Sequence, residues 1–196
     1  MVTSHRLGIG PQTARLVVKQ EVRKKGVRMR RSKGFSLIEL LIVVAIILII
    51  AAIAIPNLLR ARIAANEASA ANSVRKVATA EVAYSSAYPT IGYAPTLVEL
   101  GGTLPCTPSS TTACILDEVL SSGSKSGYNF VAVGSASGGT VVNSAFVTGS
   151  QPQTFNVTGV RYFCIITDGV LRSDPGTPGA PPANTLAACL AYPVAQ

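Results

Sequence analysis

Residues 33–56 read KGFSLIELLIVVAIILIIAAIAIP, and this stretch decides the fold. The 21 residues from Phe35 to Ile55 contain only two polar side chains, Ser36 and Glu39, so the run is long and apolar enough to span a bilayer as a helix. An ionised side chain inside a membrane-spanning helix costs roughly 2.5–3.5 kcal/mol. The Glu39 carboxylate is therefore a candidate functional group, and it requires a partner.

The basic residues of the chain are concentrated in front of this apolar run. Residues 1–34 contain 10 of the 17 lysines and arginines and one of the nine acids, whereas residues 35–196 contain seven basic and eight acidic residues. The net charge of +8 thus comes from the first 34 residues, and the rest of the chain offers no basic face for nucleic acid. By the positive-inside rule we expect a cytoplasmic N-terminus and an exported C-terminal part.

Glycine and proline divide the rest of the chain into two parts. Residues 35–88 contain no glycine and one proline, Pro56, whereas residues 89–196 contain 13 glycines and 10 prolines. Because helix interiors exclude these residues and loops collect them, we predict one helix from Phe35 to about Tyr84–Tyr88. We expect Pro56, which lacks a backbone donor, to kink or locally open this helix.

The second half of the predicted helix, residues 57–88, is amphipathic. Its apolar side chains recur at spacings of three, four or seven residues, so they share one face. They are Ile63, Ala70, Val74, Val77, Tyr84 and Tyr88. We expect this face to pack on an exported globular domain formed by residues 89–196.

That domain is predicted to contain a small antiparallel sheet. Four segments are rich in β-branched and aromatic residues: Tyr128–Val133, Ser144–Thr148, Val160–Thr167 and Val170–Ser173. Asp168-Gly169 predicts a two-residue hairpin turn. Pro89–Ser126 is expected to be mostly loop with a short helix around Ile115–Ser121, and Thr185–Leu190 a short helical piece after a Pro/Gly-rich loop. The predicted class is α+β, a long N-terminal helix packed on this sheet.

The four cysteines, Cys106, Cys114, Cys164 and Cys189, all lie in the part predicted to be exported. An even number in an oxidising compartment indicates disulfides, for which the sequence permits three pairings. Metal binding is disfavoured because there is no CxxC pair and the one histidine, His5, lies in the basic leader. The chain also lacks a nucleotide-binding loop and a Ser-His-Asp set, so we expect neither an enzyme nor a cofactor.

Three interpretations of residues 23–56 compete. An uncleaved anchor helix explains the length of the apolar run but gives no reason for Glu39. A conventional secretory signal cut after Ala54 has an apolar region of about 7–15 residues, shorter than Leu40–Ile55, and the helix-favouring sequence continues well beyond that cut. The third interpretation is a leader cut directly before Phe35.

Residues 33–56 resemble the N-terminus of type IV prepilins and pseudopilins. A glycine precedes an aromatic residue, an acid lies five residues into the mature chain, and the apolar run ends at a proline. The resemblance implies that a membrane-embedded prepilin peptidase cuts between Gly34 and Phe35 and methylates the new amine of Phe35. Residues 1–34 would be the cleaved leader, or translation would start at Met29 and leave a short one.

The resemblance further implies a structural subunit of a type IV pilus. The apolar helix, residues 35–56, would hold the subunit in the bacterial inner membrane until many copies bundle their helices into the core of a cell-surface fibre. Its partners would be other copies of itself, membrane lipid, the prepilin peptidase and methyltransferase, and the inner-membrane assembly machinery. The alternatives are a pseudopilin of a type II secretion system and, in another class, a secreted binding module or enzyme with a conventional signal peptide.

Cleavage at this site would also create a partner for Glu39. The new amine of Phe35 carries a positive charge, and in a staggered bundle it can lie beside Glu39 of a neighbouring subunit. Both charges would then be paired inside an apolar core, which lowers the cost of burying each of them and fixes the axial register. We therefore expect Glu39 to determine assembly.

The same resemblance implies a disulfide pairing. Cys164 would pair with Cys189 around the end of the sheet, and Cys106 with Cys114 in a small loop after the helix. A loop of 24 residues between Cys164 and Cys189 would contribute about 3–4 kcal/mol by the chain-entropy model. It would also restrain the Pro/Gly-rich segment Asp174–Asn184.

Overall fold

The computed structural model describes residues 34–136 and 141–195, and helix α1 is its longest element. Helix α1 spans Leu37–Ala87, close to both predicted limits. It continues through Pro56 without interruption, so this residue does not end the helix, and the kink expected there stays a prediction. The leader, apart from its last residue, and the alternative start at Met29 lie outside the described residues.

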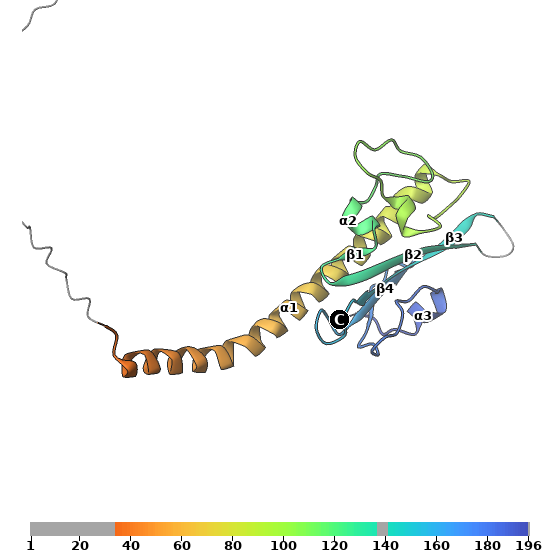
Figure 1. Cartoon of the computed structure of the whole chain (residues 1–196). Coiled ribbons are helices and arrows are strands. Elements are labelled where there is room, and N and C mark those ends of the chain that lie inside the picture. The colour runs from red at the N-terminus through yellow and green to blue at the C-terminus, as the bar shows by residue number, and fades with distance from the viewer. Residues whose placement is uncertain (1–33, 137–140, 196) are drawn as a thin grey trace, which may run out of the picture. The chain divides into compact units, whose positions relative to one another are not determined.

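Five strands form one antiparallel sheet in which each strand pairs with the next along the chain (Figure 1). They are β1 (Ser124–Lys125), β2 (Tyr128–Ala136), β3 (Asn143–Pro152), β4 (Tyr162–Ile166) and β5 (Arg172–Asp174). The longest pairing joins β2 and β3, from Tyr128 opposite Pro152 to Ala136 opposite Asn143, with a shift of register between Ser135 and Ala136. The α+β class is confirmed, and β2 to β5 overlap the four predicted strands.

The two faces of the sheet pack on different layers, because successive side chains of a strand point to opposite faces. One face packs on the second half of α1 in the main core, which includes Ala70, Val74, Val77, Tyr84, Phe130, Phe146, Phe163 and Ile165. The other face packs on the C-terminal segment with helix α3 (Leu186–Leu190) (Figure 1), and this smaller core includes Val147, Cys164, Ile166 and Cys189. The predicted apolar face of α1 is therefore confirmed from Ala70 to Tyr84, and Tyr88 packs against the same core, whereas Ile63 is half-buried and belongs to neither core.

The segment between α1 and β1 is more ordered than the loops predicted for it. It contains a short 3-10 helix, η1 (Leu97–Leu100), and helix α2 (Glu118–Ser121), which is shorter than the helix expected there. The Glu99 carboxylate accepts a hydrogen bond from the Thr96 amide (3.0 Å) and so caps η1, whose Leu97 and Leu100 are buried. The Thr-x-x-Glu spacing is a capping-box signal from which η1 could have been predicted.

The turn between β4 and β5 is longer than a two-residue hairpin. The last paired residues are Cys164 and Arg172, so the strand ladder stops before Asp168-Gly169. The Asp168 carboxylate accepts hydrogen bonds from the Val170 amide (2.9 Å) and the Arg172 guanidinium (3.1 Å). Side-chain bonds thus close the turn in place of ladder bonds, and the predicted hairpin loop is wrong in length although right in place.

Candidate functional site

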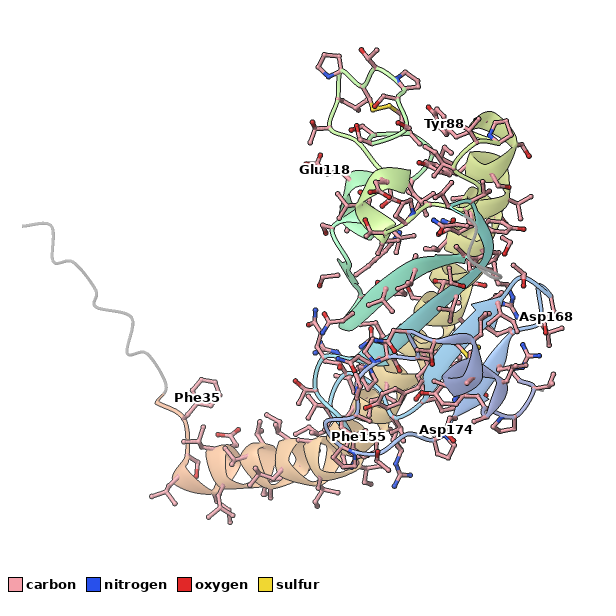
Figure 2. The ribbon with its side chains drawn as sticks, turned by 90° about the vertical axis from the view of Figure 1, so that its right-hand side faces the viewer. Phe35, Tyr88, Glu118, Phe155, Asp168 and Asp174 are labelled. Carbon is pink, nitrogen blue, oxygen red and sulfur yellow. A yellow bond between two sulfur atoms is a disulfide. The ribbon has the colours of Figure 1, made fainter. Side chains whose placement is uncertain are left out.

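The candidate site begins at the N-terminal end of the described chain, where the cleavage site is expected. The Phe35 side chain is 90% exposed, and a Cβ placed on Gly34 would meet no atom within 4 Å outside its immediate neighbours (Figure 2). None of the described residues covers the bond between Gly34 and Phe35, so this bond is accessible to a peptidase. Cleavage and methylation there stay predictions.

Glu39 caps the start of α1. Since the helix begins at Leu37, Ser36 is the N-cap residue, and the Glu39 carboxylate accepts a hydrogen bond from its backbone amide (3.1 Å). This bond is one half of a Ser-x-x-Glu capping box, and a carboxylate in the first turn also interacts favourably with the helix dipole. Glu39 thus has a role within its own chain that the sequence analysis missed, although the spacing signals it.

The apolar half of α1 is exposed to its surroundings. The large apolar side chains from Phe35 to Ile55 have exposed fractions between 46% and 90%. Among the residues that the structure describes, α1 is also the one helix long and apolar enough to cross a membrane. Apolar surface of this extent calls for a lipid environment or other apolar helices, because leaving it in water costs about 25 cal/mol per Å².

Glu67 joins the amphipathic half of α1 to the segment before β4 through hydrogen bonds and an ion pair. Its carboxylate accepts hydrogen bonds from the amides of Val160 (2.9 Å) and Arg161 (3.1 Å), and it forms an ion pair with the Arg161 guanidinium (2.8 Å). Burial raises the pKa of Glu67, but these hydrogen bonds and the charge of Arg161 outweigh it, so the pKa is lowered. The ionised form is the one that the fold stabilises.

Replacing Glu67 with alanine is expected to lower the free energy of unfolding by about 2–3 kcal/mol, because two partly buried hydrogen bonds to backbone amides lose their charged acceptor. Arg161→Ala, which leaves both amides bonded and removes a half-exposed partner, should cost about 1 kcal/mol or less. The effect of Glu67 should be present at neutral pH and vanish as the pH falls through its lowered pKa. Denaturant unfolding of the detergent-solubilised chain measures both variants, and equal losses would contradict this role.

Glu81 lies in the core between α1 and the segment that leads to η1. Its side chain is completely buried; one carboxylate oxygen accepts a hydrogen bond from the Ala94 amide (2.8 Å), and the other has no partner among the described residues. Burial raises the pKa of Glu81 to about 8, although the Ala94 bond opposes this, and the negative charge of Glu99 raises it further. Glu81 is therefore mostly protonated at neutral pH.

We expect the stability of the protein to fall with rising pH because of Glu81. The folded chain keeps this proton up to about pH 8, whereas the unfolded chain releases it near the ordinary value of 4.5. The stabilisation is therefore lost as the pH rises between these two values, and it does not change further above about pH 8. Glu81→Gln, which keeps an acceptor for Ala94, should flatten this profile and be more stable than wild type at pH 9 by on the order of 3 kcal/mol. Thermal unfolding between pH 5 and pH 9 is the measurement, and identical slopes for both proteins would contradict it.

Two disulfides cross-link the part of the chain that follows α1, with the pairing that the resemblance implies. Cys106 pairs with Cys114 (Cα atoms 6.1 Å apart) and Cys164 with Cys189 (5.8 Å apart). The second disulfide joins β4 to α3, and both of its cysteines are completely buried in the smaller core. It thereby closes the Pro/Gly-rich segment that lies between β5 and α3.

The first half of α1 is apolar and exposed, and its second half packs on a small antiparallel sheet. Together with the Gly34-Phe35 step and the acid Glu39 at the start of the helix, this arrangement defines a pilin-like protein. The N-terminal sequence matches the family model of the prokaryotic N-terminal methylation motif over residues 29–55. The type IV wide pilus major component PilA4 of Thermus thermophilus is 37% identical over 141 residues, which cover 64% of this chain and 98% of that protein. The chain belongs to the type IV pilin family, and it is a structural subunit of a pilus.

A second relative supports this assignment over a shorter stretch. The type IV major pilin protein PilA of Myxococcus xanthus is 45% identical over 56 residues, which cover 29% of this chain and 26% of that protein. No solved structure matches the chain. The strongest similarity to this relative is thus confined to a short part of both chains, whereas PilA4 is covered almost completely.

Proposed function

We propose that the chain is a prepilin that is cut between Gly34 and Phe35, N-methylated at Phe35 and polymerised through α1. Before assembly, residues 35–56 would anchor it in the bacterial inner membrane with the N-terminus in the cytoplasm and residues 89–196 on the other side. The observation that carries this proposal is the exposed apolar half of α1, which begins directly after an accessible Gly34–Phe35 bond. Lipid covers this surface before assembly and other copies of the helix cover it afterwards.

Processing would give Glu39 a partner in a second subunit. The Ser36 amide occupies one carboxylate oxygen, and within the described residues no cation forms an ion pair with Glu39. A positively charged amine at Phe35 of a neighbouring subunit can pair with this carboxylate inside the apolar bundle. The pair would set the axial step between subunits, because only one register brings the two charges together.

The names of the relatives support the assignment of this chain as a subunit of a pilus rather than as a pseudopilin of a type II secretion system. Both curated relatives are pilus components, and one of them is similar over almost its whole length. They also support a structural role rather than a catalytic one. The partners in this proposal are other copies of the chain, the prepilin peptidase and methyltransferase, the inner-membrane assembly machinery and membrane lipid, without a bound cofactor or nucleic acid.

Deletion of the gene tests the proposal directly. Electron microscopy of negatively stained cells should show surface fibres on the parent strain, none on the deletion strain, and fibres again when the full chain is supplied from a plasmid. A plasmid encoding a chain whose residues 1–55 are replaced by an unrelated secretory signal is the control, and it should export the domain without restoring fibres. Unchanged fibres on the deletion strain would contradict this proposal.

A further inference from the structure

Unpaired positive charge is concentrated on the solvent side of α1. Within residues 34–136 and 141–195, the basic side chains that form no ion pair are Arg60, Arg62, Arg75 and Lys76, and all of them lie on this helix. The two acids in its amphipathic half, Glu67 and Glu81, are buried against the domain and do not offset this charge. The exposed face of the amphipathic half of α1 therefore lacks acids from its own helix.

Arg75 stands beside an apolar groove. The groove has a volume of about 320 Å³ and lies between α1 and the neighbouring ends of β3 and β4. Its exposed apolar side chain is Val82 (53% exposed), whereas Phe146 and Ile165, which also line it, are buried in the main core. Gly169 of the β4–β5 turn lines it as well. Among the described residues, the Arg75 guanidinium donates a hydrogen bond only to the neutral side chain of Asn72 (3.2 Å), one turn away. We call this feature the α1 groove.

Helix α2 carries the complementary group. Val119 is 58% exposed, and the neighbouring Glu118 carboxylate is exposed and makes no hydrogen bond or ion pair among the described residues. Figure 2 shows Glu118 and Asp168 on opposite edges of the domain. Asp168 is next to Gly169, which lines the α1 groove, so the groove lies near the Asp168 edge. The exposed apolar and acidic side chains of α2, Val119 and Glu118, therefore lie on the opposite edge from the groove and its Arg75.

We infer that α2 of one subunit docks into the α1 groove of the next subunit in the fibre, with Val119 against the exposed Val82 and Glu118 paired with Arg75. This inference rests on the proposed polymer. A polar helical fibre needs two different surfaces on separate sides of the subunit, so that each copy offers one surface and receives the other. The opposite charges of Glu118 and Arg75 favour this partner and set its register.

Charge reversal tests the pair. Arg75→Glu and Glu118→Arg should each reduce the number of fibres per cell about tenfold, because like charges would meet in the groove. The double variant should restore the fibres. Lys76→Glu is the matched control, since Lys76 is exposed on the same helix but does not line the α1 groove. Glu118→Arg should therefore fail to rescue any defect of Lys76→Glu.

Cross-linking tests the contact independently of charge. In sheared fibres, Val82→Cys combined with Val119→Cys should give a ladder of disulfide-linked subunits on non-reducing gels, whereas Val82→Cys combined with Val157→Cys should not. Wild-type fibre numbers in both charge variants, a double variant no better than the single ones, or intact fibres without a ladder would each overturn the inference. Absence of fibres from wild-type cells would instead overturn the proposed polymer.

Discussion

Replacing Glu39 with valine is expected to abolish fibres while leaving export and cleavage intact. In the variant, the positively charged amine of Phe35 would have no carboxylate beside it at each contact between neighbouring helices. Removing one partner of a buried ion pair costs about 3–5 kcal/mol. At about 1.4 kcal/mol per factor of ten, each contact would weaken by roughly a hundredfold or more. Immunoblots should show processed subunit in the membrane at wild-type amounts, and electron microscopy should show bare cells.

Glu39→Gln separates the charge from the helix cap. Glutamine at this position can still accept the hydrogen bond from the Ser36 amide, which the carboxylate accepts in the structure. If the ion pair between subunits drives assembly, the glutamine variant should lose its fibres as the valine variant does. Normal fibres in Glu39→Gln would show that Glu39 acts only as a cap of α1.

Removing the disulfide between Cys164 and Cys189 is expected to be the most destabilising change in residues 89–196. With both cysteines replaced by alanine, the unfolded chain regains the freedom of a long loop, which should lower the free energy of unfolding by about 3–4 kcal/mol. Domains of this kind are stable by only about 5–15 kcal/mol. Limited proteolysis of the detergent-solubilised chain should then cut the segment between β5 and α3, and fibre numbers should fall.

The other disulfide is the matched control. Cys106 and Cys114 are only eight positions apart and half-buried, so replacing both with alanine should cost about 2.5 kcal/mol. The protease-sensitive segment between β5 and α3 should stay protected in this control. Equal sensitivity of that segment in both variants would contradict a local role for the disulfide between Cys164 and Cys189.

The long helix and its two halves could be predicted from the sequence because their signals are local. The absence of glycine from residues 35–88 marks the helix, and the spacing of Ala70, Val74, Val77 and Tyr84 marks the face that the structure buries. The strands were located by their β-branched and aromatic residues. The capping residues Ser36 and Thr96 carry equally local signals, which were overlooked.

The polar contacts that hold the domain on α1 could not be predicted in this way. The Glu67 carboxylate accepts hydrogen bonds from the amides of Val160 and Arg161, which lie more than 90 positions further along the chain. No spacing pattern in the sequence predicts a contact between residues so far apart. Glu81 is an acid on the face of α1 that packs against the domain, and a buried acid needs a hydrogen-bond partner. The sequence therefore indicates that a partner exists but not which residue it is. The bond of Glu81 to the Ala94 amide depends on the path of a loop, which only the tertiary structure shows.

The mature N-terminus tests the central claim most directly. Mass spectrometry of subunits from sheared fibres should find a first residue of N-methylated Phe35, with residues 1–34 absent. This result would support the cleavage site and the amine that Glu39 is proposed to pair with. A mature chain that begins at Ile55, or one that retains its leader in assembled fibres, would contradict the claim.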